Sequence, residues 1–194
     1  MTRGMQLILV AMTAIGFYIG ESKFVVNSAI GLLVSFLPAM LEQDHDISLS
    51  PGIVIWITSA LFLHALGSAG FYNFISWWDH LTHSLSASLV AAIGYTVVRS
   101  VDIHSEEVKL PDRFMFIFIL MTVLAFGVVW ELFEYGLEII ADITKLKMPL
   151  AQHGLEDTMK DMTFNTIGAL IVAVLGQAHL NNLAEKLMDQ LNSE

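Results

Sequence analysis

The stretch FMFIFILMTVLAFGVVWELFEYGLEII, residues 114–140, decides the fold class of this chain. It carries no charged side chain before Glu131. A helix needs about 20 mostly apolar residues to cross the hydrocarbon core of a bilayer. The stretch therefore predicts a transmembrane helix, and its length allows that helix to tilt or to extend beyond the bilayer.

The remainder of the chain repeats this pattern. Hydrophobic residues make up 55% of the 194 residues, and charged residues make up only 14%. Soluble domains carry about 25% charged residues. We therefore expect an all-α polytopic membrane protein, a bundle of about six transmembrane helices. Besides residues 114–140, the predicted helices are Met5–Gly20, Phe24–Leu41, Ile53–Gly70, His80–Val98 and Asp161–Ala178.

The two ends of the chain need separate treatment. Arg3, followed by an apolar run and small residues, is similar to a signal peptide, but we expect this segment to be kept as the first helix. Residues 1–179 are predicted to form a single transmembrane domain. Residues 180–194 are predicted to form a short amphipathic helix and tail, because leucines recur there at helical spacing along one stripe.

Composition excludes several classes of chemistry and partner. The chain has no cysteine, which removes disulfides, cysteine-ligated zinc, iron–sulfur clusters and thiol nucleophiles. Its formal net charge is -10, and several acids lie in or near the apolar segments. Nucleic acid, itself a polyanion, is therefore not an expected partner. Membrane lipids are the expected partners.

Three polar clusters interrupt the apolar segments. They are Asp79-His80-x-x-His83, Glu131-x-x-Glu134 and Asp157-x-x-x-Asp161-x-x-x-Asn165. Ionisable residues at membrane depth are costly and usually mark a functional site. Counting the crossings from the N-terminus places all three clusters in the same half of the membrane, on the side where the first helix ends. His64 falls in that half as well.

The clusters together predict a metal site. Residues three or four positions apart share one face of a helix, so each cluster forms a polar stripe. Crowded carboxylates repel each other when ionised, and Lys160 is the only basic residue among them. Either several of these acids are protonated, or a divalent cation is bound among them. Oxygen and imidazole ligands without sulfur favour Zn, Fe or Mn, and an all-oxygen subset suits Mg or Ca. Helical bundles with such ligands commonly hold two metals, and the ligand supply here allows one or two. The predicted ligands are Asp79, His83, Glu131, Glu134, Asp157 and Asp161, with His80, His64, Glu138 and Asn165 around them.

Ordinary structural roles are open to the same residues. Asp79 and Asp157 can serve as helix N-caps. Glu131 and Glu134 can be solvated charges beyond the membrane end of a long helix, although their apolar neighbours argue against that. His64 can be a hydrogen-bonded core histidine.

The motifs together resemble a known family. Trp77-Trp78-Asp79-x-x-x-His83, Trp130-Glu131-x-x-Glu134 and Asp157-Thr-Met-x-Asp161-x-x-x-Asn165-x-x-Gly168 are similar to the YjdF-like small inner-membrane proteins. The last motif is also distantly VanZ-like. The resemblance covers most of the chain and implies a six-helix membrane protein. It implies that the carboxylates and His83 belong together, and it implies no particular activity.

Three functions fit these observations. The first is an integral membrane protein with an intramembrane metal site, a metal-dependent enzyme acting on a lipid or other apolar substrate, with Glu134 as the candidate general base. The second is a transporter of protons or divalent cations. The third is an accessory subunit of a larger membrane complex, docked on a membrane-protein partner through the C-terminal helix.

The sequence also predicts a location. We expect a multi-pass protein of the inner, cytoplasmic membrane. The side of the two termini carries Arg3, Arg99, Lys109, Arg113 and Lys186, and the other side carries Lys23, Lys145, Lys147 and Lys160. Because cytoplasmic loops carry the excess of basic residues, both termini are predicted to be cytoplasmic.

Overall fold

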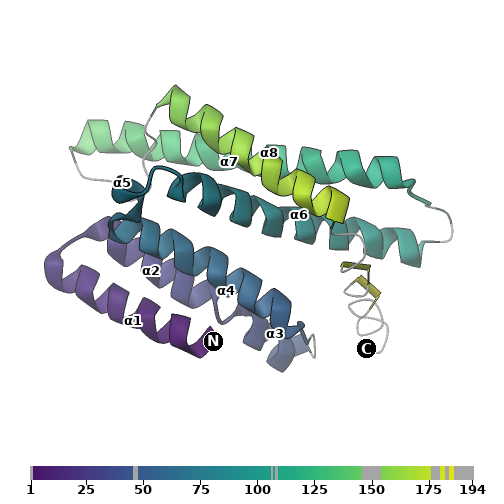
Figure 1. The fold of residues 1–194 in the computed structure, drawn as a ribbon, viewed down its shortest axis with the longest axis horizontal. Coiled ribbons are helices and arrows are strands. Elements are labelled where there is room, and N and C mark those ends of the chain that lie inside the picture. The colour runs from purple at the N-terminus through teal and green to yellow at the C-terminus, as the bar shows by residue number, and fades with distance from the viewer. Residues whose placement is uncertain are drawn as a thin grey trace.

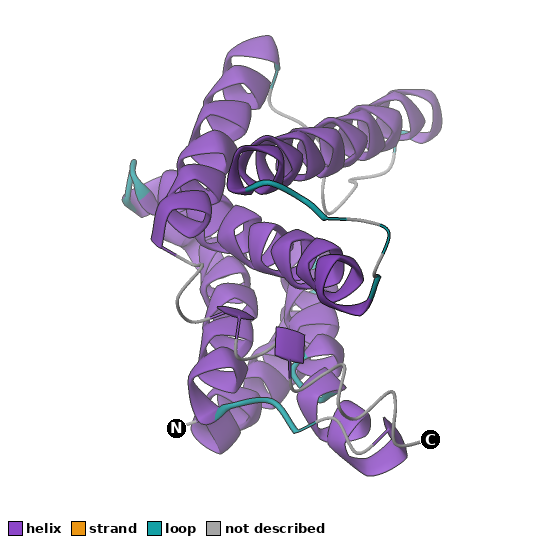
Figure 2. Cartoon of the chain, turned by 90° about the vertical axis from the view of Figure 1, so that its right-hand side faces the viewer, coloured by secondary structure: helices purple, strands orange, loops and turns teal. Residues whose placement is uncertain are grey.

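The chain is helical throughout its described part. The computed structural model describes residues 2–45, 48–105, 107, 109–145, 154–175, 180–181 and 184–185, and this part contains helices, loops and no strand (Figure 2). The elements are α1 (Thr2–Ile19), α2 (Ser22–Val34), α3 (Leu37–His45), α4 (Pro51–Leu66), the π-helical turn η1 (Gly67–Phe71), α5 (Tyr72–Phe74), α6 (Trp78–His104), α7 (Asp112–Thr144) and α8 (Leu155–Leu175).

Six helical segments of the described chain are long and apolar enough to cross a membrane. They are Thr2–Ile19, Ser22–Gln43, Pro51–Phe74, Trp78–Ile103, Asp112–Thr144 and Leu155–Leu175. Large apolar side chains such as Phe17 and Leu155 lie exposed on the outer surface, as lipid-facing residues do. The predicted all-α polytopic fold is confirmed.

The helices form two groups that meet along α4 and α6. In one group α1, α2 and α4 pack on one another, and in the other α6, α7 and α8 do so (Figure 1). The crossings alternate in direction along the chain. The late part of α4, the start of α6, the later part of α7 and the start of α8 therefore lie at the same end of the bundle, at the left of Figure 1.

The contact between α6 and α8 is unusually close because small residues face each other there. Ala87 and Ala91 on α6 and Ala169 and Ala173 on α8 are all buried. A Cβ atom added at Gly168 would lie 2.2 Å from the backbone oxygen of Ser84, so only glycine fits. In a bilayer, where lipid tails are as apolar as leucine, such close packing supplies much of the association energy.

The second predicted helix, Phe24–Leu41, is broken in the structure between α2 and α3. Pro38 has no N–H to offer the carbonyl of Val34, and the residue before a proline avoids the helical region. The side chain of Gln6 donates hydrogen bonds to Ser35 O at 3.2 Å and to Ser35 Oγ at 3.1 Å. These bonds from α1 fix the break in place.

The third predicted helix, Ile53–Gly70, corresponds to two elements. The α-helix α4 ends at Leu66, and the π-helical turn η1 follows it directly. Gly70 in this turn has φ 128°, a value that favours glycine over any other residue. The turn brings the ring of Tyr72 back over Gly67, where an added Cβ would lie 2.3 Å from the ring. The glycines of η1 therefore position Tyr72 against α4.

The remaining predicted transmembrane helices all begin too late, and α1 begins at Thr2 rather than at the predicted Met5. Helix α6 extends from Trp78 to His104, and α7 from Asp112 to Thr144. Helix α8 begins at Leu155, so the predicted start at Asp161 was wrong and Asp157 lies in its first turn. The predicted C-terminal helix lies mostly outside the described residues. Within the described part, Leu180 and Ala184 are buried, Leu180 packs into the core of the bundle, and Tyr95 donates a hydrogen bond to Asn181 Oδ1.

Candidate metal centre

The starts of α6 and α8 bring three ligand-type side chains together. His83 Nε2 lies 3.6 Å from Asp79 Oδ1 and 3.5 Å from Asp161 Oδ1. One ligand atom from each of the three residues lies within 4.8 Å of the other two. Asp79 and His83 meet because they are four positions apart on α6, and the close α6–α8 packing adds Asp161.

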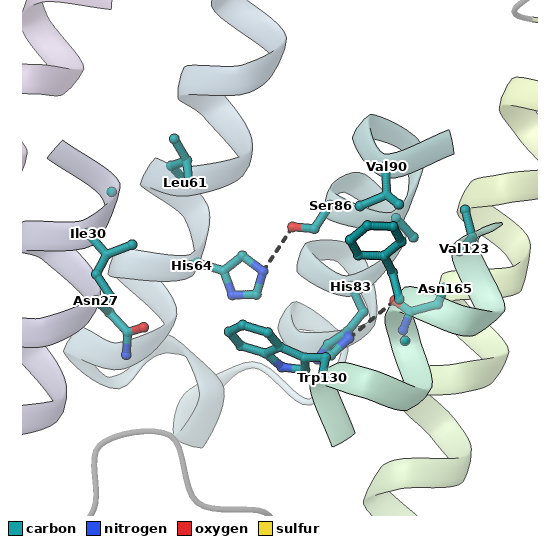
Figure 3. A pocket seen from close by; sticks show the side chains of 14 residues that line it. Asn27, Ile30, Leu61, His64, His83, Ser86, Val90, Val123, Trp130 and Asn165 are labelled. Carbon is teal, nitrogen blue, oxygen red and sulfur yellow. Dashed lines mark hydrogen bonds between the residues drawn. The ribbon is translucent and has the colours of Figure 1, made fainter. Parts of the chain in front are cut away.

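Asn165 fixes the orientation of the His83 ring. The Nδ1 atom of His83 lies 3.3 Å from Asn165 Oδ1 (Figure 3). An amide oxygen only accepts hydrogen bonds, so Nδ1 carries the proton and donates it. In a neutral ring, Nε2 then carries a lone pair, and this atom faces the carboxylates of Asp79 and Asp161.

The spacing of the three groups leaves room for a cation between them. Distances of 3.5 and 3.6 Å are too long for good hydrogen bonds from Nε2. Ligand atoms of a tetrahedral Zn²⁺ ion with bonds of about 2.0–2.2 Å lie about 3.3–3.6 Å apart. A histidine ligand whose other ring nitrogen donates to a carbonyl oxygen is also the usual arrangement at metal sites. The residues therefore fit a metal ion.

The burial of Asp161 strengthens this interpretation. The Asp161 side chain is only 4% exposed, and its Oδ1 atom accepts no hydrogen bond from any described residue. The nearby Lys160 does not balance it, because Lys160 Nζ pairs with Glu156 Oε1 at 2.7 Å on the exposed face of α8. A buried carboxylate without a compensating charge is expensive, so a cation at this point would stabilise the fold.

Helix α7 places Glu131 next to the three residues. Glu131 is buried, and it interacts electrostatically with His83, Asp157 and Asp79. The Thr158 hydroxyl donates a hydrogen bond to its carboxylate. Glu131 is thus near the group but is not one of its three converging ligands.

The other predicted ligands lie further out. Trp130 Nε1 donates a hydrogen bond of 2.9 Å to Glu134 Oε1, which holds this carboxylate on the surface of α7. Asp157 is half-buried in the first turn of α8, and Glu138 is half-buried one turn beyond Glu134. None of these joins the three converging ligand atoms. A role for them in binding metal stays a prediction.

The two remaining histidines of this region have different surroundings. The His80 ring stacks on Phe164, with 4.0 Å between ring centroids, and so packs α6 on α8. The centroid of the His64 ring lies 6.1 Å from the centroid of the His83 ring. Its Nδ1 atom is 2.7 Å from the Tyr72 hydroxyl and its Nε2 atom 3.0 Å from Ser86 Oγ. His64 is therefore hydrogen-bonded, as a core histidine would be, but it also borders a cavity.

The cavity beside His83 has a volume of about 340 Å³. Residues of α2 and α4 line one side and residues of α6, α7 and α8 line the other (Figure 3). Most of the lining is apolar, and its polar side chains include His64, His83, Ser86, Asn27 and Asn165. Sequence reasoning missed Ser86 and Tyr72. The only signal for Ser86 was its spacing of three from His83, and Tyr72 depends on the η1 turn.

Comparison with known proteins assigns the chain to a family. Residues 1–182 match the family described as predicted membrane protein (DUF2238). The chain belongs to this family. A protein of Thermotoga maritima, called only "uncharacterized protein", is 24% identical over 173 residues, which cover 86% of this chain and 85% of that protein. No solved structure matches the chain.

Membership in DUF2238 agrees with the six candidate spans and with the resemblance to small YjdF-like membrane proteins. The chain is a multi-pass membrane protein. The inner membrane and cytoplasmic termini stay predictions.

Proposed function

We propose that this protein is a membrane-embedded metal-dependent enzyme that acts on an apolar substrate. The metal is held by Asp79 Oδ1, His83 Nε2 and Asp161 Oδ1. One observation carries the proposal, namely that His83 Nε2 lies 3.6 and 3.5 Å from the Asp79 and Asp161 carboxylates while Asn165 Oδ1 lies beside the opposite ring nitrogen. Three protein ligands with a fourth position left open are typical of catalytic zinc sites, and Fe or Mn is the alternative.

Such a metal can activate a water molecule or polarise a carbonyl or phosphoryl oxygen. A carboxylate close to the metal can then act as general base. Glu131 is better placed for this role than Glu134, because Glu131 interacts with His83 and Asp79 whereas Glu134 is held by Trp130.

The cavity supports an apolar substrate. It borders His83 and Asn165, and its walls include Ile30, Val90 and Phe126. Ligand sites are generally apolar pockets with a few converging polar groups, and this one lies beside the candidate metal centre. A lipid chain or another apolar group in this cavity would place its polar end near His83.

The packing between the site and the opposite end of the bundle favours an enzyme over a transporter. Ions crossing the membrane would need polar groups beyond the site, toward the far ends of α6, α7 and α8. The described residues there form an apolar core that includes Ala91, Ile119, Val123 and Ala173. This core supports a closed site. An accessory role, with a partner at the C-terminal segment, stays a prediction without a supporting contact.

The test is metal analysis of the purified full-length protein in detergent by mass spectrometry. We expect about one equivalent of Zn, Fe or Mn after metal has been offered and weakly bound metal removed. Asp161→Asn should lose most of it. Glu156→Gln is the matched control, because it neutralises an exposed carboxylate on the same helix and should keep the metal. Metal-free wild-type protein, or equal metal in both variants, would overturn the proposal.

A further inference from the structure

A second polar group in the same cavity has the geometry of a nucleophile and its base. Ser86 on α6 and His64 on α4 both line the cavity, with 3.0 Å between Ser86 Oγ and His64 Nε2. Tyr72 lies on the other side of His64, with its hydroxyl 2.7 Å from Nδ1. A nucleophile, a base and a group that orients the base are the recurring parts of hydroxyl catalysis.

The hydroxyl of Ser86 behaves differently from its neighbours. Serine and threonine within helices commonly donate to the backbone carbonyl one turn back. Thr82, Ser88 and Thr96 on α6 all do so, with distances of 2.9, 2.6 and 2.8 Å. Ser86 donates to no backbone carbonyl among the described residues, so its proton is available to His64.

The proton on the other side of the ring has a matching acceptor. With Nε2 accepting from Ser86, Nδ1 carries the ring proton and donates it to the Tyr72 oxygen. Thr82 lies beside the Tyr72 hydroxyl, and the proton of Thr82 is already donated to the Asp79 carbonyl. The Thr82 oxygen can therefore accept the proton of Tyr72, and every donor in the series has an acceptor.

The fold holds this arrangement by two specific features. The Tyr72 ring reaches His64 because Gly67 leaves room for it and Gly70 adopts a positive φ. Trp78 Nε1 donates a hydrogen bond of 3.0 Å to Leu63 O, which ties the start of α6 to α4 next to His64. Rigid support of this kind is what a catalytic pair needs.

We infer that Ser86 and His64 form a catalytic pair for acyl transfer from an apolar ester, with Tyr72 as the positioning residue. This inference goes beyond the proposed function, because it needs no metal. It names the apolar substrate as a carboxylic ester whose acyl chain occupies the cavity.

The reaction proceeds in two steps. Ser86 Oγ bonds to the ester carbonyl carbon while its proton passes to His64 Nε2. The tetrahedral adduct collapses, the ester C–O bond breaks, and the departing alkoxide takes that proton. Water or another alcohol then attacks the acyl-serine, gives its proton to Nε2, and the acyl group leaves as Ser86 regains its proton.

A long-chain alkyl fluorophosphonate tests the pair on full-length protein in detergent. Ser86 Oγ would bond to phosphorus and expel fluoride, with the serine proton passing through His64 to solvent. We expect one adduct, located on Ser86 by peptide mass spectrometry. Ser86→Ala should give none, and His64→Ala should react at least about 100-fold more slowly, since a general base contributes about 10²–10⁴.

Two variants separate catalysis from folding. Ser88→Ala removes a buried hydroxyl one half-turn further along α6 and should react at the wild-type rate with an unchanged melting temperature. Tyr72→Phe should slow labelling and change its pH profile while the melting temperature stays near that of the wild type. Folded wild-type protein that gives no Ser86 adduct, or equal rates in the wild type and His64→Ala, would overturn the inference.

Metal analysis of the same samples separates this inference from the proposed function. Ser86→Ala should retain metal. Labelling of Ser86 in a protein that binds no metal would refute the metal centre and leave the catalytic pair standing. Metal binding by a protein whose Ser86 is not labelled would refute the catalytic pair and leave the metal centre standing.

Discussion

Among single residues, Asn165 has the most specific task. Its side chain is buried, and its amide oxygen accepts the hydrogen bond from His83 Nδ1 that directs Nε2 toward Asp79 and Asp161. Groups that orient a metal ligand in this way contribute roughly 10–100-fold to metal affinity. Asn165 would therefore act on a bound metal without being one of the three converging ligands.

Replacing Asn165 tests this role. Asn165→Ala should weaken Zn²⁺ binding by about 10–100-fold, because the ring loses the acceptor that fixes its proton on Nδ1. Asn165→Asp keeps an acceptor and should bind at least as tightly as the wild type. The measurement is a competition titration against a chromogenic chelator. Thr166→Ala, the next residue on α8, is the control, and an Asn165→Ala affinity equal to that control would contradict the assignment.

Among the elements, the α6–α8 pair decides whether the metal centre exists at all. Asp79 and His83 come from α6, and Asp161 and Asn165 come from α8. Their spacing across the interface is set where the Gly168 Cα meets the Ser84 backbone. A change in this packing should therefore disturb both stability and metal binding.

Gly168→Ala makes that link measurable. The added methyl group would lie 2.2 Å from Ser84 O and must push the helices apart. Overpacking of this kind costs about 1–3 kcal/mol, so the melting temperature in detergent should fall and metal content should fall with it. Gly136→Ala on α7, where an added Cβ meets nothing within 4 Å, should leave both unchanged or raise stability. Equal stability of the two variants would refute the close contact.

The elements also show what the sequence could predict. The spacing of Asp79 and His83 needed only the helical repeat, and the apolar runs sufficed for the six spans. The break at Pro38 was readable in principle, because the proline was visible within the predicted helix. The pairing of Ser86 with His64 was not, since it depends on how α4 and α6 pack. Nor was the position of Tyr72, which follows from the backbone of η1.

At the scale of the whole molecule, the two helix groups enclose the cavity between them. Helices α2 and α4 of the first group supply one wall, and α6, α7 and α8 supply the other together with the candidate metal centre (Figure 1). If all six candidate spans cross the membrane, both termini are predicted to lie on the side opposite the site. With cytoplasmic termini, the site lies toward the outer face of the membrane.

Terminal fusions test this topology. Green fluorescent protein joined to either end should fluoresce, and alkaline phosphatase joined to either end should be inactive, because both ends are predicted to be cytoplasmic. Active phosphatase at both ends would reverse the orientation and keep the six crossings. Ends on opposite sides of the membrane would refute the six crossings themselves.

The most direct test of the central claim is the X-ray absorption spectrum of the protein loaded with one equivalent of Zn²⁺. The account predicts oxygen and nitrogen neighbours at about 2.0–2.2 Å, together with the outer-shell scattering of an imidazole ring. In His83→Asp, which keeps a ligand oxygen, the metal should remain and the imidazole signal should disappear. An imidazole signal that persists in His83→Asp, or a wild-type spectrum without one, would contradict a metal centre built on Asp79, His83 and Asp161.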